Sequence, residues 1–174
     1  EACNTWYDAL PDVVEEYMNK INELTGRDYK PFNYYGAPDA EHVIVVMGSA
    51  SGCIRETVDY LLAKGEKVGF IDVHLYRPFS AKHFLAQLPE TVKRITVNDR
   101  TKEPGAVGEP LYEDVCSVIL ESGKDIDVYA CRFGLASKDY TPAQVIAEYD
   151  NMKAAEPKNH YTIGINDDVT HLSL

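Results

Sequence analysis

The chain has 174 residues, 45% of them hydrophobic, which is long and apolar enough for one domain with a sizeable core. Its 28 acidic residues outnumber its 17 basic ones and give a formal net charge of -11, with no offsetting cluster of lysine and arginine, which argues against a nucleic-acid-binding surface. No apolar run approaches the roughly 18 residues that a membrane span needs.

The first residues and the cysteines bear on the origin of the chain. The start Glu1-Ala2-Cys3-Asn4 has neither the basic nor the apolar region of a secretion signal, and it lacks methionine, so we expect a fragment of a longer cytoplasmic protein. The four cysteines lie far apart and form no C-x-x-C pair, which predicts reduced thiols rather than a zinc site or an iron–sulfur cluster. They are Cys3, Cys53, Cys116 and Cys131.

Residues 1–41 are expected to form an N-terminal amphipathic helix followed by an aromatic linker. Apolar residues recur at helical spacing over residues 11–24, and Gly26 ends this helix, whose apolar face needs a partner surface. Residues 26–41 mix proline and glycine with aromatic residues, a composition too irregular for a helix or strand. We interpret them as a linker laid across a surface, since the acidic balance disfavours a base-stacking platform.

Residues 42–155 alternate between strand and helix patterns, as in an α/β core domain. Helical periodicity follows the strand patterns, and Ser80 and Thr141 are placed to cap two of the helices. Gln144 completes a capping box with Thr141, and Pro142 suits the first helical position. Apolar, β-branched runs predict core strands at residues 43–47, 67–73, 92–97 and 126–130.

The pattern predicts an α/β fold with three αβα layers around a mainly parallel, open sheet of about five strands. The fifth strand, at residues 161–165, is expected at an edge of the sheet. It lies within a C-terminal edge segment and exit linker, residues 156–174. Helical segments of about a dozen residues between strands supply the right-handed crossovers that parallel strands require.

The turn after the first core strand is a weak candidate for phosphate or cofactor binding. Gly48, Ser49, Ser51 and Gly52 lie between a strand and a helix N-terminus, where open α/β sheets bind phosphate. However, Ala50 interrupts both the dinucleotide fingerprint G-x-G-x-x-G and the nucleophile elbow G-x-S-x-G, and no Gly-Lys pair completes a Walker loop. A tight turn with close helix packing explains the small residues better.

No local spacing predicts a metal site. The five histidines show neither H-x-H nor H-E-x-x-H spacing. Asp167 and Asp168, with Thr170 and His171, offer hard oxygen ligands for a cation, although a solvated turn explains them better. Arg77 stands where it could reach an anion, but pairing with a neighbouring carboxylate is its more ordinary role.

The segment after the third core strand concentrates charge and glycine. Arg100, Thr101 and Lys102 could hold an anion, whereas Glu103 and Glu109 oppose this. Glu109 is expected in the first turn of a helix over residues 107–121, where it complements the helix dipole. Mixed charge of this kind suits a protein contact on a loop. The candidate interdomain residues are therefore Arg100, Thr101, Lys102, Glu103, Gly105, Gly108 and Glu109.

Several blocks of the chain closely resemble the internal region of pyruvate:ferredoxin (flavodoxin) oxidoreductases, and they occur in the family's order. They extend over roughly residues 26–174, which makes chance agreement implausible. The blocks are YYGAPDA (34–40), LYRPFS (75–80), DRTKEPGAVGEPLY (99–112), FGLASKDYTP (133–142) and EPKNHYTIGI (156–165).

The resemblance implies a piece of a much longer enzyme, its second domain, similar to the C-terminal domain of transketolase. The family oxidatively decarboxylates pyruvate with coenzyme A to acetyl-CoA and carbon dioxide. It uses thiamine diphosphate, Mg and iron–sulfur clusters, passes electrons to ferredoxin or flavodoxin, and is expected to be a homodimer. Because other domains of that family hold the thiamine diphosphate and the clusters, the resemblance assigns no catalytic residue, cofactor or metal ligand to this chain.

We therefore expect a structural and assembly domain that is inactive alone and contacts other domains of the same enzyme. One alternative is a small-ligand module that binds coenzyme A or another phosphate at residues 48–52 or at the loop 100–108. Another is a free-standing interaction subunit, since some 2-oxoacid oxidoreductases are split into separate polypeptides.

Overall fold

A single mixed sheet forms the centre of the protein. The computed structural model describes residues 1–166 and 169–174, so the turn at Asp167 and Asp168 that we considered as a cation site lies outside the described residues. The strands are β1 (Phe32–Gly36), β2 (His42–Val46), β3 (Val68–Val73), β4 (Arg94–Asp99), β5 (Asp127–Arg132) and β6 (Tyr161–Thr162). Their order is β1-β3-β2-β4-β5-β6, and β1 is antiparallel to β3 while the other pairs are parallel.

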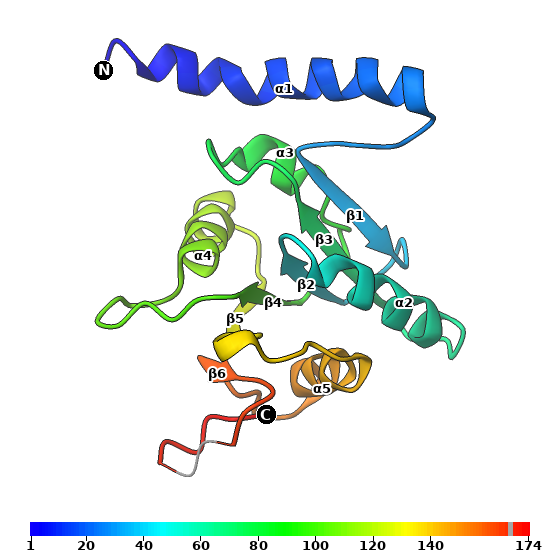
Figure 1. The fold of residues 1–174 in the computed structure, drawn as a ribbon, viewed down its shortest axis with the longest axis vertical. Coiled ribbons are helices and arrows are strands. Elements are labelled where there is room, and N and C mark those ends of the chain that lie inside the picture. Colours follow the sequence, from blue (N-terminus) through cyan, green and yellow to red (C-terminus); the bar gives the residue numbers. More distant parts are fainter. Residues whose placement is uncertain (167–168) are drawn as a thin grey trace.

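Helices cover both faces of this sheet. They are α1 (Asn4–Thr25), α2 (Ala50–Leu62), α3 (Ala81–Leu85), α4 (Pro110–Ser122) and α5 (Pro142–Lys153), with a short 3-10 turn, η1 (Leu135–Ser137). Helices α2 and α5 lie on one face, and α3 and α4 lie on the other (Figure 1). The predicted three-layer αβα fold with a mainly parallel sheet is therefore confirmed.

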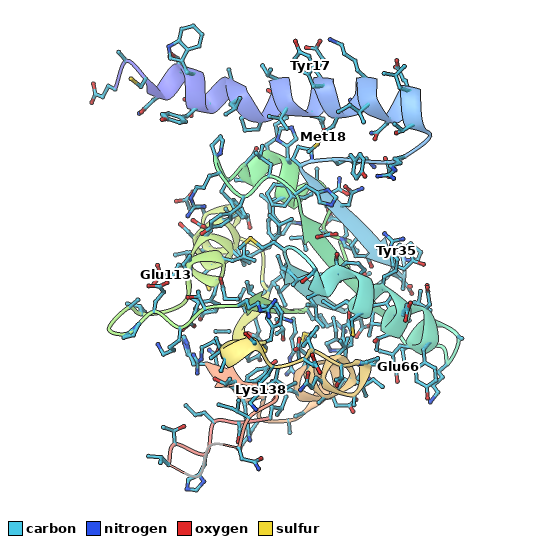
Figure 2. All side chains as sticks on the ribbon, in the orientation of Figure 1. Tyr17, Met18, Tyr35, Glu66, Glu113 and Lys138 are labelled. Carbon is cyan, nitrogen blue, oxygen red and sulfur yellow. The ribbon has the colours of Figure 1, made fainter. Side chains whose placement is uncertain are left out.

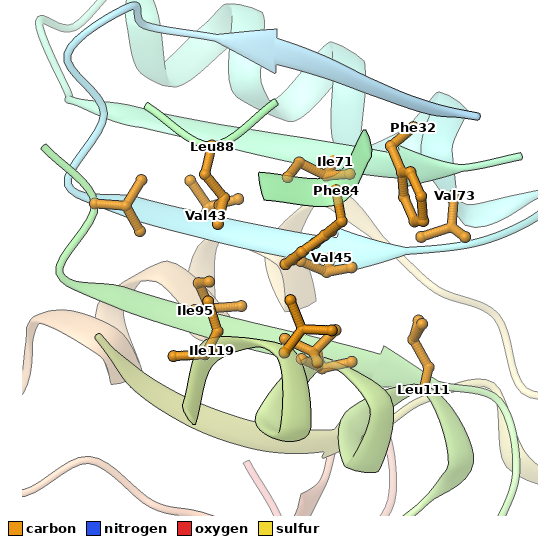
Figure 3. Packing of buried hydrophobic residues seen from close by; sticks show 14 of the residues in the cluster. Phe32, Val43, Val45, Ile71, Val73, Phe84, Leu88, Ile95, Leu111 and Ile119 are labelled. Atoms are coloured by element: carbon orange, nitrogen blue, oxygen red, sulfur yellow. The ribbon is translucent and has the colours of Figure 1, made fainter. Parts of the chain in front are cut away.

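Each face of the sheet has its own apolar core, because side chains alternate along a strand. In β2, Val43 and Val45 point to the α3 and α4 side, where they pack with Ile95 and Leu111 (Figure 3). Ile44 and Val46 point to the α2 and α5 side. Burial on both faces explains why the central strands are apolar at nearly every position.

Strand β1 was not predicted, and the expectation that residues 26–41 contain no regular element is wrong. This strand lies at the edge of the sheet, so Tyr34 and Tyr35 are half-buried and give no apolar run. Its pairing depends on Gly69 in β3, where a Cβ atom would overlap the Tyr34 ring. Gly69, which leaves room for Tyr34 of β1, is thus distant from it in the sequence, so a local sequence pattern cannot predict the pairing.

Several predicted boundaries also move. Asn98 and Asp99, expected in a loop, are the last residues of β4. Helix α4 begins at Pro110 rather than near residue 107, because Pro110 occupies the first helical position. The last strand is shorter than expected and ends at Thr162. In contrast, the predicted caps are confirmed: Ser80 accepts the His83 N–H at the start of α3, and the Thr141 N–H donates to Gln144 Oε1 at 2.9 Å.

Helix α1 lies across the α3 end of the domain (Figure 1). It starts before the predicted position and ends at Gly26 as expected, and within it only Pro11 is buried. Figure 2 shows Met18 directed toward the body and Tyr17 directed away from it. Tyr17 and Leu24 of the expected apolar face are 60% and 87% exposed, so much of that face has no partner among the described residues. Trp6, which precedes the predicted helix, is 78% exposed. No helix in the described ranges combines the length and apolarity needed to cross a membrane.

Candidate functional site

The topology singles out one edge of the sheet as the place for a ligand. From β2 the chain winds to its neighbour β3, and it then returns to β4 on the other side of β2. The winding direction therefore reverses between β2 and β4. Loops that leave the carboxyl ends of parallel strands diverge at such a switch point, where open α/β sheets bind ligands.

A cavity of about 210 Å³ opens at this edge. Its walls come from the segments that follow β2, β4 and β5, so it unites Ser49 and Arg100 from two separately predicted candidate segments. The lining residues are Ser49, Ala50, Cys53, Arg100, Phe133, Gly134, Ser137, Lys138, Asp139 and Tyr140.

The rest of the glycine-rich turn is occupied with its own structure. The Ser51 hydroxyl donates to the Gly48 carbonyl at 3.0 Å, and Gly48 has a φ of +83°, which glycine adopts at no steric cost. Gly52 lies within the first turns of α2. The tight-turn interpretation of these small residues agrees with this geometry, and of the four candidates Ser49 is the one that lines the cavity.

The charge on the cavity wall is mixed. Arg100 and Lys138 contribute cations, and Asp139 contributes a carboxylate. Arg100 is held by a hydrogen bond from its Nε to the Gly134 carbonyl at 3.3 Å. Burial raises the pKa of the Cys53 thiol, so this side chain is no ready nucleophile. The wall can attract a small anion, but it does not present a nucleophile beside a base.

The loop on the β5 side of the cavity is conformationally strained. Ala136 and Ser137 have φ values of +55° and +58°, in the left-handed region that non-glycine residues rarely adopt. Each such residue costs roughly 1–3 kcal/mol, and strain of this kind gathers at binding and switching segments. Gly134, at +61°, also allows the close approach of Arg100, since a Cβ atom there would lie 2.8 Å from Arg100 Nε.

Asp99 fixes the base of the charged loop. It is 3% exposed, and its carboxylate accepts the backbone N–H groups of Leu111 at 3.1 Å and Tyr112 at 3.0 Å. These are two of the free amides in the first turn of α4, so a residue of β4 caps the following helix. Burial raises the pKa of Asp99, although the two amide donors act in the opposite direction.

Glu109 has a different role from the predicted one. It is the N-cap residue of α4 rather than part of its first turn, and it is 1% exposed. Its carboxylate lies 3.4 Å from Arg132 Nη1 and 3.4 Å from Lys102 Nζ. Arg132 is also buried and donates from Nε to the Thr162 hydroxyl at 2.9 Å, so the ion pair connects α4 to β5 and β6. Sequence patterns did not identify Arg132.

The tip of the loop is exposed, while its charges partly neutralise one another. Lys102 pairs with Glu109, and the Thr101 hydroxyl donates to Glu103 at 3.3 Å. Val107 is 89% exposed, and the loop extends away from the sheet (Figure 1). Gly105 has a φ of +86° at the tip. The related expectation for Arg77 also agrees with the structure, since Arg77 Nη1 lies 2.6 Å from the Asp114 carboxylate.

A buried carboxylate lies beneath the cavity. Glu148 of α5 is fully buried and accepts from Asn98 Nδ2 and the Tyr140 hydroxyl, each at 2.9 Å, and from Cys131 Sγ at 3.6 Å. Burial raises the pKa of Glu148 to about 7, against the opposing effect of its three donors. Sequence analysis did not select this residue. The available signal was its position on the apolar face of α5, between Val145 and the buried end of the helix.

The fold and this edge define an open, doubly wound α/β domain whose switch-point crevice contains no complete catalytic constellation among the described residues. The chain belongs to the family described as pyruvate:ferredoxin oxidoreductase core domain II, whose model matches residues 40–145. The resemblance seen in the sequence blocks is confirmed.

Relatives of known name support this membership over the whole chain. A pyruvate:ferredoxin oxidoreductase of Moorella thermoacetica is 59% identical over 174 residues, and a pyruvate-flavodoxin oxidoreductase of Enterobacter agglomerans is 54% identical over the same length. A probable pyruvate-flavodoxin oxidoreductase of Escherichia coli is 52% identical over 180 residues. Each alignment covers 100% of this chain and 15% of the relative, so the chain corresponds to one domain of larger proteins.

A solved structure supports the fold alone. A 2-oxoglutarate:ferredoxin oxidoreductase from Magnetococcus marinus, with 2-oxoglutarate, coenzyme A and succinyl-CoA bound, matches 76% of this chain with a TM-score of 0.51 and 22% sequence identity. The match covers 21% of that protein's chain.

Removal of Glu109 should destabilise the domain strongly. Glu109→Ala leaves Arg132 buried beside no carboxylate, and loss of one partner of a buried pair costs about 3–5 kcal/mol. Urea unfolding monitored by circular dichroism measures this free energy. Glu121→Ala, an exposed glutamate of the same helix, is the control and should change it by less than about 0.5 kcal/mol. Equal losses in the two variants would contradict this role for the ion pair.

Glu148 should make the domain less stable as the pH rises. Its pKa is raised from 4.5 to about 7 by folding, so between these values the folded state holds a proton that the unfolded state has lost. The contribution of Glu148 to stability is therefore fully present below pH 4.5 and is lost as the pH rises through 7, by about 3 kcal/mol in total.

Comparison with Glu148→Gln isolates this effect, because the other titrating groups are common to both proteins. Between pH 5 and pH 8 the natural chain should lose about 2.5 kcal/mol more unfolding free energy than the variant. A constant difference between the two proteins across this range would show that Glu148 titrates normally.

Proposed function

We propose that this chain is the assembly domain of a pyruvate:ferredoxin or pyruvate:flavodoxin oxidoreductase and is inactive alone. In the proposal the complete enzyme oxidatively decarboxylates pyruvate with coenzyme A to acetyl-CoA and carbon dioxide in the cytoplasm. It passes the electrons to ferredoxin or flavodoxin and is a homodimer. Support comes from the names of relatives that align along the whole chain, of which this chain forms 15%.

The observation that carries the assembly role is the exposed apolar surface beside a complete core. Both faces of the sheet are covered, yet the loop tip at Val107 and the α1 residues Trp6 and Leu24 remain largely exposed. A side chain of this size gains free energy when a neighbouring domain removes it from water. The rigid base at Asp99 and Glu109 holds the loop in a fixed orientation for such a contact.

The cofactors of the proposed enzyme belong to its other domains. Thiamine diphosphate, Mg and iron–sulfur clusters would supply the decarboxylation and electron-transfer chemistry there. The cysteines of this chain do not fit a cluster, since among the described residues no three of them gather, and burial raises the pKa of Cys116 and Cys131 above the usual thiol range. The residues of this chain therefore supply no step of the reaction in the proposal. Its free thiols are in keeping with a cytoplasmic location.

A change at the loop tip should disturb assembly rather than one chemical step. Val107→Asp places a charge on an exposed side chain, and Gly105→Val strains a backbone at φ +86° that has open space around it. In the full-length enzyme each should shift the oligomer toward smaller species in size-exclusion chromatography. Arg100→Ala should act in the same direction.

The control for Val107→Asp is Ser117→Asp, which places the same charge at an exposed polar residue of α4. It should leave the elution profile unchanged. Normal assembly of the loop variants would refute the proposal, as would decarboxylation of pyruvate by the purified 174-residue chain.

A second candidate function is binding of coenzyme A or another phosphate at the switch-point cavity. The favouring observation is that Ser49, Arg100 and Lys138 line one cavity from three different segments. If this holds, calorimetry of the chain with coenzyme A gives saturable heat that Arg100→Gln weakens at least about tenfold, while Lys102→Gln, outside the cavity, does not. Absence of saturable heat, or equal loss in both variants, would exclude this function.

A further inference from the structure

Three potential metal ligands meet where α1 crosses α3. Asp12 and Glu15 lie three residues apart on α1, which puts both carboxylates on one side of the helix. His83 comes from α3. One potential ligand atom from each of the three side chains lies within 4.8 Å of those from the other two. Among the described residues, this is the one group of three potential metal ligands. The spacing of histidines in the sequence could not predict this cluster, because His83 lies far from Asp12 and Glu15 along the chain.

His83 is held as metal-binding histidines are held. It is 7% exposed, and its Nδ1 lies 2.7 Å from the Ser80 hydroxyl. A hydrogen bond at one ring nitrogen fixes the ring orientation, and the Ser80 hydroxyl can accept the Nδ1 proton, which leaves the other nitrogen available as a ligand. Ser80 is itself fixed because it caps α3. The ring is thus oriented by the fold and not by the two carboxylates.

The other ring nitrogen has no hydrogen-bond partner in the described part of the protein. His83 Nε2 is buried, and it faces Asp12 Oδ1 at 3.2 Å and Glu15 Oε2 at 3.4 Å. A protonated imidazole between two carboxylates would donate a hydrogen bond to one of them. The distances are short enough for this, but the alignment of Nε2 with the oxygens does not satisfy the geometry of a hydrogen bond.

The distances match those between ligands of one tetrahedral ion. Zinc–nitrogen and zinc–oxygen bonds of about 2.0–2.1 Å place neighbouring ligand atoms about 3.3 Å apart. The two separations from His83 Nε2, 3.2 and 3.4 Å, are close to this edge length. Asp12 is largely exposed, so its side chain can rotate to close the remaining edge.

The geometry points to a binding site for a divalent cation of the zinc class, formed by Asp12, Glu15 and His83. One imidazole and two carboxylates form a donor set that zinc and similar first-row cations accept, and a water would complete four-coordination. The ion would clamp α1 to α3. Lys82 competes with it, because its Nζ lies 2.7 Å from Asp12 Oδ1.

Titration of metal-free protein tests the site. The chain is dialysed against a chelator and titrated with Zn²⁺ in a calorimeter and with Co²⁺ in a spectrophotometer. We expect one ion per chain and visible absorption bands of four-coordinate Co²⁺. His83→Gln should abolish the one-to-one phase, and Ser80→Ala should weaken it about 10–100-fold. Lys82→Met should tighten binding, because it removes the competing ammonium.

The matched control is His74→Gln. His74 Nε2 also lies 3.4 Å from a carboxylate oxygen, that of Asp72, but it faces one carboxylate and not two. This variant should bind the ion normally. Absence of one-to-one binding in the natural chain, equal loss in the His74 and His83 variants, or weaker binding in Lys82→Met would each overturn the assignment. Far-ultraviolet circular dichroism confirms that each variant is folded before its titration is interpreted.

Discussion

The structure of the switch-point edge depends on the buried carboxylate of Asp99. Its two hydrogen bonds hold the end of β4 close to the first turn of α4. Residues 100–109 therefore form a loop whose two ends are fixed. The pairing of Glu109 with Arg132 adds a second connection, from the start of α4 to β5. Because both carboxylates are buried, the base of the loop is rigid while its tip reaches solvent. Arg100 is the first residue beyond this base, which places it in the wall of the cavity.

Much of the fold could be predicted from the sequence, for a physical reason that also sets the limit. Strands such as β2, buried on both faces, must be apolar at nearly every position and so stand out. Caps such as Ser80 are local and could be recognised from neighbouring residues. Strand β1 satisfies neither condition. It is half-exposed, and its pairing depends on the space that Gly69, far along the chain, leaves for Tyr34.

The candidate site was less predictable, because its contacts join distant segments. The sequence identified the charges of Glu109 and Arg100 but not their partners, and it assigned to Glu109 the helix-terminal role that Asp99 performs. Burial of Glu148 could have been predicted from its position on the apolar face of α5. The meeting of Ser49 with Arg100 follows from the sheet order, which places the ends of β2 and β4 side by side.

The exposure of Trp6 has a consequence for spectroscopy. It is the single tryptophan of the chain, and it is 78% exposed on α1, away from both apolar cores. The fluorescence of Trp6 in the isolated chain is therefore that of a solvent-exposed indole, and unfolding of the sheet changes this fluorescence little. If the proposed contact with a neighbouring domain covers α1, the same indole enters an apolar environment. Its fluorescence then indicates docking, while tyrosine signals follow the core.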